Sequence, residues 1–570
     1  MLPVVSRRAV RSVCLATWCV CCITFGLAQD QGRNYVNAQM PWHNAVLDSQ
    51  GKLLAWYHPE KNLGYDQVLR LTWDFLEHKV PLDTEKGTNL KIYLTFPIYQ
   101  EKSLQGVEYQ HNPASFFAHM VDEVVNWYPY SGDKEAVGVV RDMLDYQLAH
   151  GMTPGDWDWA GVPFATSCAG DKDYGHCISD MPRSFYGGIE TDKVAELGLG
   201  YITFYEMTGE RRYLDVGLHC ADALVKHVRP GDADHTPWPF RVDAHTGDVI
   251  AGEEFGGMVV AAVRLLDELI RLGVGDTSNY RKTRDLAWNW ILAIQLTENP
   301  ASGRWSGYYE DVPKDPLNVN DQSSMMTAYY ILSRDDPGTL EPNPAPLRSW
   351  QTHVGYLLDR SRGLLGRGPF FGAWGIDEQQ HPVVSIPGLS GASCCSRAGL
   401  SCRTAAWGAI NAMYYEKTGD GSARENAFRS LNYTTYFMDW DGRFACCGLS
   451  HGSTYWFEDG YADAGRNLMW AMGAIPEFAP VGQNRLLRSS SVVQKVKYED
   501  RAVEYNTFDD GGVAVLRLNF KPLRITAAGK SLSTRNDLEQ PGYTLQALAD
   551  GDYVVRIRHL GAKQVIVTGR

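Results

Sequence analysis

The chain has 570 residues, of which 44% are hydrophobic and 21% are charged. This is the composition of a globular protein with a large core and a smaller second domain, and it argues against disorder and fibrous repeats. Lys and Arg total 54 against 67 Asp and Glu, so the formal net charge is -13. Nucleic-acid binding needs a basic surface, and we therefore expect no nucleic-acid partner.

The N-terminus has the pattern of an export signal. Arg7, Arg8 and Arg11 precede an apolar run from Val13 to Ala28, which ends in a small-x-small cleavage pattern. An ordinary secretory signal at residues 1–28 is favoured over a twin-arginine signal, because paired arginines are common in any basic leader. No other apolar stretch is long enough to span a bilayer. We expect an exported protein, periplasmic or extracellular, with no membrane span in the mature chain.

Eight cysteines follow the predicted signal, since 4 of the 12 lie within it. An even number in an exported chain favours disulfides, and the first pair expected is Cys168 with Cys177, across a polar loop. A metal site is the competing interpretation, but the sequence has no CxxC pair and no HExxH helix, so we expect neither a metal nor a cofactor. The other cysteines expected to lie near one another are Cys394, Cys395, Cys402, Cys446 and Cys447.

From residue 60 onward, apolar periodicity predicts twelve helices of two alternating kinds. One kind is apolar on nearly every side and contains many small residues, as close packing between helices requires. The other kind is amphipathic, with one polar face. The apolar helices are 114–128, 190–208, 253–271, 321–333, 403–417 and 459–473, and the amphipathic ones are 66–79, 134–150, 211–228, 279–296, 346–360 and 421–438.

The connections between these helices also alternate in length. An apolar helix leads to the next amphipathic one through a short turn with Gly, which stops the helix. The return connections are long: 80–113, 150–189, 229–252, 297–320, 361–402 and 439–458. We therefore expect two concentric rings of helices, with every long connection at one rim, around the N-termini of the inner helices.

The repeated hairpins, with phrases such as TGERRYLDVGLHCADAL and TGDGSARENAFRSL, resemble the six-hairpin, or (α/α)6 toroid, carbohydrate-active enzymes. The resemblance covers about residues 60–478 and leaves residues 29–59 as an N-terminal extension. It implies a mainly α fold and a carbohydrate substrate. That group includes glycoside hydrolases, polysaccharide lyases and sugar epimerases, so the fold does not determine the reaction.

A small all-β domain is predicted after a Pro-rich exit at 477–480. Segments between residues 484 and 570 alternate in polarity or are rich in β-branched residues, with turns at 509–512 and 550–552. This pattern is typical of a β-sandwich. A structural role, packed against the helical ring, is favoured over glycan binding.

Carboxylates in the long connections are the candidate catalytic groups. Glycosidic bonds are hydrolysed between two carboxyl groups, one that donates a proton and one that is charged. Acids at helix N-termini also cap free N–H groups, so some of these residues are expected to be structural. The candidates are Glu190 and Asp192, Glu254, Glu310 and Asp311, and Glu458, with Asp459 as a neighbour of Glu458.

Aromatic residues beside these acids are the candidate substrate contacts, because flat rings stack on sugars, although Trp also fills protein cores. The first group is Trp157 and Trp159 with Asp158 between them. The second group, Trp305, Tyr308 and Tyr309, lies in the same connection as Glu310, where neighbouring rings would raise the pKa of the acid. Trp456 precedes the last apolar helix.

The sequence therefore predicts an exported glycoside hydrolase that acts on a poly- or oligosaccharide through paired carboxyl groups. A lyase is the first alternative. It would need a Tyr or His base and a cation to neutralise a uronate carboxylate. A glycan-binding protein without catalysis is the second. The lyase candidates are Tyr308, Tyr309, His111, His381, His451 and Arg183.

Overall fold

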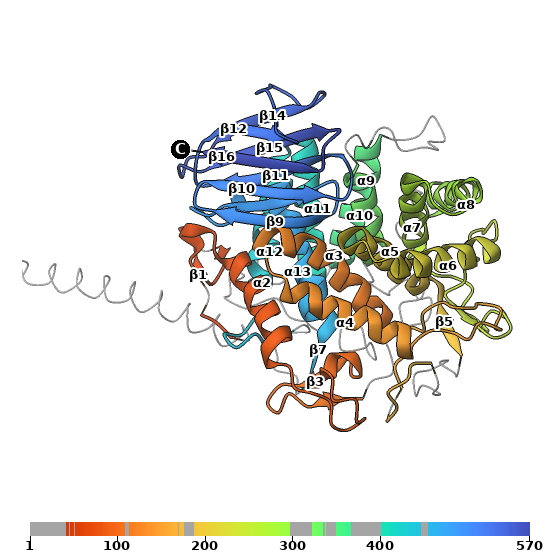
Figure 1. The fold of residues 1–570 in the computed structure, drawn as a ribbon. Coiled ribbons are helices and arrows are strands. Elements are labelled where there is room, and N and C mark those ends of the chain that lie inside the picture. Colours follow the sequence, from red (N-terminus) through yellow and green to blue (C-terminus); the bar gives the residue numbers. More distant parts are fainter. Residues whose placement is uncertain are drawn as a thin grey trace, which may run out of the picture.

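A computed structural model shows the chain as a large helical unit followed by a compact β domain (Figure 1). It describes residues 42–44, 46–50, 52–108, 113–168, 170–175, 187–296, 322–334, 337, 349–365, 401–445 and 454–569. The predicted signal and the partners expected for Cys168 lie outside these residues, so the export signal and the disulfides stay predictions. Within the described part of the chain, no helix is both long and apolar enough to cross a membrane.

Helices of the two predicted kinds alternate along the described chain. The first kind, called central helices below, has mostly buried side chains, and the second kind, the outer helices, has one exposed face. The central helices are α3 (Pro113–Ser131), α5 (Thr191–Thr208), α7 (Val259–Leu272), α9 (Gln322–Leu332), α11 (Ser401–Thr418) and α13 (Asp463–Ala474). The outer helices are α2 (Gly64–Asp74), α4 (Glu135–His150), α6 (Arg211–His227), α8 (Thr277–Trp290), α10 (Trp350–Leu365) and α12 (Gly421–Thr435).

Two helices continue into π-helical turns, α2 into η2 (Phe75–Lys79) and α8 into η4 (Ile291–Gln295). A third π-helical turn, η8 (Glu458–Ala462), precedes α13. The sequence placed the start of α7 six residues too early. Residues 253–258 are instead held against residues 236–240, where the Phe240 N–H donates to the Glu253 carbonyl at 2.9 Å. A local apolar pattern cannot reveal this pairing, since it depends on a distant segment.

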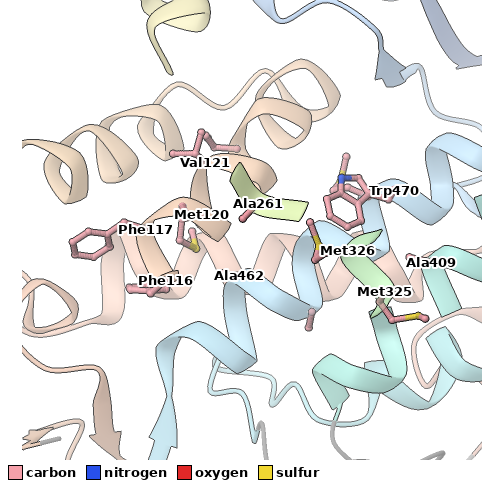
Figure 2. Packing of buried hydrophobic residues seen from close by; sticks show 14 of the residues in the cluster. Phe116, Phe117, Met120, Val121, Ala261, Met325, Met326, Ala409, Ala462 and Trp470 are labelled. Atoms are coloured by element: carbon pink, nitrogen blue, oxygen red, sulfur yellow. The ribbon is translucent and has the colours of Figure 1, made fainter. Parts of the chain in front are cut away.

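The central helices contact one another in a closed cycle. The contacts run from α3 to α5, α7, α9, α11 and α13, and α13 in turn contacts α3. Each of α4, α6, α8, α10 and α12 contacts the central helix that precedes it in the chain. The apolar core between the central helices includes Phe116, Met120, Met326 and Trp470 (Figure 2).

Short turns join the central helices to the outer helices that follow them. At Gly209 and Gly419 the backbone has φ of 78° and 73°, a conformation that glycine adopts without strain. Each of these glycines directly follows the last residue of a central helix and donates its N–H back to the helix, which stops it.

The long connections form small sheets that the sequence analysis did not predict. One antiparallel sheet has the order β4 (Gly106–Val107), β3 (Ile98–Gln100) and β7 (Thr454–Trp456), and so joins the connection after α2 to the one before α13. A second pairs β5 (Gly188–Glu190) with β6 (Arg241–Asp243). Figure 1 shows β3, β5 and β7 at the end of the helical unit away from the β domain.

The β domain consists of two antiparallel sheets that share one apolar core. The first has the order β13 (Lys530–Ser531), β12 (Pro522–Ala527), β16 (Gln564–Gly569), β10 (Ala502–Thr507) and β9 (Val493–Glu499). The second has the order β14 (Gly542–Ala547), β15 (Tyr553–Leu560), β11 (Gly511–Leu518) and β8 (Arg485–Ser489).

The β domain packs on the C-terminal ends of the central helices. The Tyr498 hydroxyl donates to the carbonyl of Pro129 in α3, and the Gln494 amide donates to the carbonyl of Glu206 in α5 at 2.7 Å. Arg271, in the last turn of α7, pairs with Asp509 at 2.8 Å. The end of the helical unit with short turns is therefore covered by the β domain, and the N-terminal ends of the central helices face the long connections.

Candidate functional site

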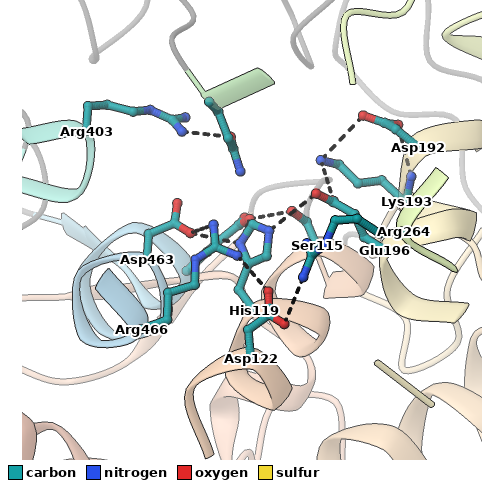
Figure 3. A network of polar contacts seen from close by, with 12 residues as sticks. Ser115, His119, Asp122, Asp192, Lys193, Glu196, Arg264, Arg403, Asp463 and Arg466 are labelled. Atoms are coloured by element: carbon teal, nitrogen blue, oxygen red, sulfur yellow. Dashed lines mark hydrogen bonds and ion pairs between the residues drawn. The ribbon is translucent and has the colours of Figure 1, made fainter. Parts of the chain in front are cut away.

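Charged and polar side chains gather between the N-terminal halves of the central helices (Figure 3). We call this group the central polar cluster. Charged groups are rarely buried unless they are paired, so such a cluster inside an apolar core is a candidate functional site. Its members are Ser115, His119, Asp192, Lys193, Glu196, Gln322, Arg403, Glu458, Asp463 and Arg466.

Helical spacing directs these side chains to one place. Ser115 and His119 are four residues apart on α3, and Asp192 and Glu196 have the same spacing on α5, so each pair lies on one helix face. Because the two helices contact each other and α3 also contacts α13, the polar faces meet at the centre of the cycle.

His119 is the centre of the cluster and is only 2% exposed. Its Nδ1 lies 2.9 Å from a carboxylate oxygen of Asp463 and 3.2 Å from one of Glu458. Its Nε2 lies 3.6 Å from Glu196 on α5. Ser115 donates a hydrogen bond of 2.5 Å to Glu458. One imidazole thus joins carboxylates from α5, η8 and α13.

Lys193 extends the cluster to Asp192. The buried ammonium lies 3.3 Å from Glu196 and 3.7 Å from Asp192. Asp192 therefore connects to His119 through one lysine and one glutamate. The Asp192 side chain keeps 14% of its surface exposed, and Asp192 borders a small pocket with Trp238, Phe240 and Met258.

Arginines complete the cluster on the side of α11 and α13. Arg466 donates to Asp463 at 2.7 Å, within α13. Arg403, on α11, donates to the Gln322 side chain at 2.7 Å. These four residues line a void of about 10 Å³ together with Trp470. Asp463 thus lies beside a small void, and the neighbouring cations stabilise its negative charge.

Ion pairing raises the pKa of the histidine in this cluster and lowers the pKa values of two of its carboxylates. Burial and Arg466 disfavour the charge on His119, but Asp463 and Glu196 outweigh them and raise its pKa to about 10. Burial also disfavours the charges of the two carboxylates, yet Arg466 and His119 lower the pKa of Asp463, and Lys193 and His119 lower that of Glu196. At neutral pH His119 is a cation, and both carboxylates are charged.

Asp192 has the opposite shift. Burial raises its pKa to about 7, and the neighbouring carboxylates Glu190 and Glu196 add to the rise, against the lowering effect of Lys193. Near neutral pH this carboxyl group is protonated in about half of the molecules. One network of ion pairs thus contains a carboxyl group that is partly protonated near neutral pH and two carboxylates that are charged.

The structure brings three of the predicted catalytic residues to this region. Glu458 and Asp192 belong to the central polar cluster. Glu190 lies next to Asp192 at the end of β5, is 2% exposed and accepts a 2.7 Å hydrogen bond from Arg241 on β6. Asp459, beside Glu458, is also buried.

The other described candidates are not members of the cluster. Glu254 is partly exposed and pairs with Arg229 at 3.1 Å. Asp158 pairs with Lys226 at 2.6 Å, near the C-terminal end of α6. Trp159 is buried and stacks on His227 with a centroid distance of 4.2 Å. Trp157 and Trp456 are partly buried, the first beside His245 and the second in β7.

The remaining candidates fall outside the described residues, and their roles stay predictions. They are the catalytic candidates Glu310 and Asp311, the aromatic residues Trp305, Tyr308 and Tyr309, and the lyase candidates His111, His381, His451 and Arg183.

Sequence reasoning missed His119, Lys193, Glu196, Asp463 and Arg466, because it looked for catalytic acids in the connections and not on the helices. The signal was present in the sequence. Each of these charged residues interrupts a helix that is otherwise apolar on nearly every side. A charge at such a position has to find a partner inside the protein.

Three members of the cluster are residue types that can bind a metal ion. Ligand atoms of His119, Glu458 and Asp463 lie within 4.8 Å of one another. However, His119 is held protonated, and Arg466 donates to the same Asp463 oxygen that faces His119. A metal ligand must present a lone pair, so these groups fit an ion-pair cluster better than a cation site.

No family model matches the sequence, and no curated protein matches it. Several solved structures similar to this chain are carbohydrate-processing enzymes. The cellobiose 2-epimerase from Spirochaeta thermophila DSM 6192 has 10% identity and a TM-score of 0.46, covering 72% of this chain and 98% of its own. A D-mannose isomerase has 10% identity and a TM-score of 0.45, covering 71% and 96%. The β-1,3-1,4-glucanase from Paenibacillus sp. X4 has 11% identity and a TM-score of 0.42, covering 76% and 98%. Likeness at this distance assigns neither a family nor a reaction.

Proposed function

We propose that the protein is an exported glycoside hydrolase that cleaves a poly- or oligosaccharide at the central polar cluster. The observation that supports this most directly is the contrast between Asp192, with a pKa near neutrality, and the charged carboxylates Asp463 and Glu196. Glycosidic bond hydrolysis by this mechanism needs one protonated and one ionised carboxyl group.

Asp192 is the proposed general acid. Its carboxyl group is protonated in part of the population at neutral pH, and it borders a pocket with Trp238 and Phe240. A proton donated to the glycosidic oxygen would leave the Asp192 carboxylate beside Lys193, which stabilises the new charge.

Asp463 is the proposed base or nucleophile. Arg466 and His119 keep it ionised, and it borders the void that Gln322 and Arg403 also line. His119 is a positioning residue in this scheme. As a buried cation it orients Asp463 and Glu458, and with a pKa of about 10 it does not act as a base at neutral pH.

The proposed architecture is the (α/α)6 toroid. The closed cycle of contacts among the central helices supports it, as does the resemblance of the repeated turn-and-helix phrases to six-hairpin enzymes. In such a ring the N-terminal ends of the inner helices share one rim, which agrees with the position of the central polar cluster.

A lyase activity is the second candidate function, and one observation favours it. Arg403 and Arg466 line the same small void as Asp463. Two guanidinium groups would neutralise a uronate carboxylate, as β-elimination requires. Elimination forms an unsaturated product, whereas hydrolysis forms only a new reducing end.

The proposal is tested with the purified protein on a panel of neutral and uronate-containing polysaccharides. Reducing ends and absorbance at about 230 nm, where an unsaturated uronate absorbs, are followed together. We expect reducing ends from at least one neutral glycan without an increase in absorbance. Asp463→Asn should lower kcat by about 100-fold or more, while the exposed Asp215→Asn on α6 should retain wild-type activity.

An increase in absorbance would show that the reaction is elimination and not hydrolysis. Wild-type activity in the folded Asp463→Asn variant would place the catalytic site elsewhere. Folding of each variant is checked by its thermal unfolding curve, because Asp463 also supports the ion pairs around His119.

A further inference from the structure

A second cavity lies at the opposite end of the helical unit. Its volume is about 600 Å³, far larger than the void beside Asp463. It lies between the C-terminal halves of α5, α7, α9 and α11 and the part of the β domain formed by β8 and the turn that follows it. The volume is within the range of small-molecule sites, which often form where two domains meet.

Many of the residues that line this cavity form ion pairs. Arg264 lies 3.5 Å from Asp122, and Arg271 lies 2.5 Å from Glu268. Arg334 pairs with Asp267, whose carboxylate also accepts a 2.6 Å hydrogen bond from Tyr330. Arg488, on β8, binds both oxygens of Glu416 at 2.6 and 2.7 Å. These guanidinium groups already have carboxylate partners, and Lys417, whose ammonium donates to the Arg334 carbonyl at 2.8 Å, adds a further cation. The wall therefore offers both hydrogen-bond donors and acceptors.

Aromatic rings stand between these ion pairs. Tyr329 on α9 stacks on Trp470 of α13 with a centroid distance of 4.0 Å, and the Arg264 guanidinium lies 5.2 Å from the Tyr329 centroid. All three residues line the cavity. Rings beside charged hydrogen-bonding groups are the surroundings that sugars favour, since a sugar has apolar C–H faces and a rim of hydroxyl groups.

We propose that this cavity is a second saccharide-binding site, which takes a neutral mono- or disaccharide. A hydroxyl group donates to a carboxylate and accepts from a guanidinium, so a polyol can bond to both kinds of group in this wall without adding a charge to it. A small anion would compete with the carboxylates that already hold the arginines. The volume suits one or two sugar units, and the ligand class does not depend on which reaction the central polar cluster performs.

Thr203 provides a test of this site because it lines the cavity from α5 and has no part in the central polar cluster. Thr203→Trp places a large ring in the cavity. Thr203→Val is the matched control, since it keeps the size of the side chain and removes only the hydroxyl group. Leu199→Trp, one turn earlier on the same helix, fills the cavity independently if the first variant does not fold.

Binding is measured by calorimetry with glucose, galactose, mannose, xylose and cellobiose as probes, and with inorganic phosphate as the anionic reference. We expect at least one sugar to bind the wild type and Thr203→Val equally, and its affinity to fall about tenfold or more in a folded Trp variant. The same sugar should bind Asp463→Asn with unchanged affinity at this site, even if that variant shows the proposed hydrolase function to be wrong.

Three results would overturn the proposal: no sugar binds the wild type, phosphate binds more tightly than every sugar, or both folded Trp variants bind the sugar as the wild type does.

Discussion

The burial of charge is the least favourable contribution of the central polar cluster to the free energy of folding. Each ion removed from water costs several kcal/mol even after the protein has relaxed around it. The cluster offsets this cost by alternating signs, from Asp192 through Lys193, Glu196 and His119 to Asp463. Loss of any one member leaves its neighbours without partners, so effects on stability and on chemistry have to be separated for each residue.

Asp192 gives the sharpest test of chemistry at this scale. Its active form is the protonated acid, which is present below its pKa of about 7 and is lost as the pH rises through that value. We expect kcat of the wild type to fall on the alkaline side of about pH 7. In Asp192→Asn this decline should disappear, and kcat on a natural glycan should drop by about 100- to 10,000-fold.

An aryl glycoside with a good leaving group needs little help from an acid, so on that substrate the loss in Asp192→Asn should be much smaller. Steady-state kinetics over the pH range on both substrates check this. An equal loss on the two substrates would contradict a proton-donating role for Asp192.

At the scale of the helix, close contact between neighbours depends on small residues. Gly217 on α6 faces Ile202 of α5, and a Cβ atom added to Gly217 would lie 2.3 Å from the Ile202 Cδ1 atom. Gly138 on α4, in contrast, has no atom within 4 Å of the position that a Cβ would occupy. Glycine is thus needed for packing at the first position and not at the second.

Substitution of these two glycines by alanine should have opposite effects. Gly217→Ala overpacks the interface between α5 and α6 and should lower the free energy of unfolding by about 1–3 kcal/mol. Gly138→Ala should raise it by about 0.5–1 kcal/mol, because alanine favours a helix more than glycine does. Denaturant titrations measure both. With Ile202→Ala, which removes both clashing atoms, Cδ1 and Cγ1, the cost of Gly217→Ala should shrink. An undiminished cost would show that this contact is not limiting.

The helices were predictable because their determinants are local. Apolar spacing and the glycines after α5 and α11 placed all twelve helices within a few residues, apart from the start of α7. The small sheets in the long connections were not predicted, since β3 pairs with β7, which is far away in the sequence. The candidate site was only partly predictable. Acids in the connections are visible as a pattern, but the partners of His119 are set by which helices meet.

At the scale of the whole molecule, one arginine fastens the β domain to the helical unit. Arg517 on β11 is fully buried. It donates to the carbonyls of Pro476 and Ala479 in the exit from α13, and it pairs with Asp552 at 2.9 Å and Asp550 at 2.6 Å. A single guanidinium therefore holds both the connecting segment and a turn of the β domain.

Arg517→Ala should lower the free energy of unfolding by about 3–5 kcal/mol, because it leaves buried Asp552 without its cation. The matched control is Arg524→Ala on β12, an exposed arginine, which should change stability by no more than about 0.5 kcal/mol. Unfolding followed by fluorescence compares the two. A similar loss of unfolding free energy in both variants would show that Arg517 does not hold the β domain to the helical unit.

The closed cycle of central helices has a consequence for synthesis of the chain. α3 completes its contacts only with α13, and α2 lies against α12 and α13, while Asn62 is held to the carbonyl of Glu477 at 2.7 Å. The first hairpin to leave the ribosome is thus the last to bury its surface, since its final neighbours are translated near the end of the helical unit. Until then its apolar faces remain exposed, whereas a protein whose neighbours in space are also neighbours in sequence buries such faces earlier.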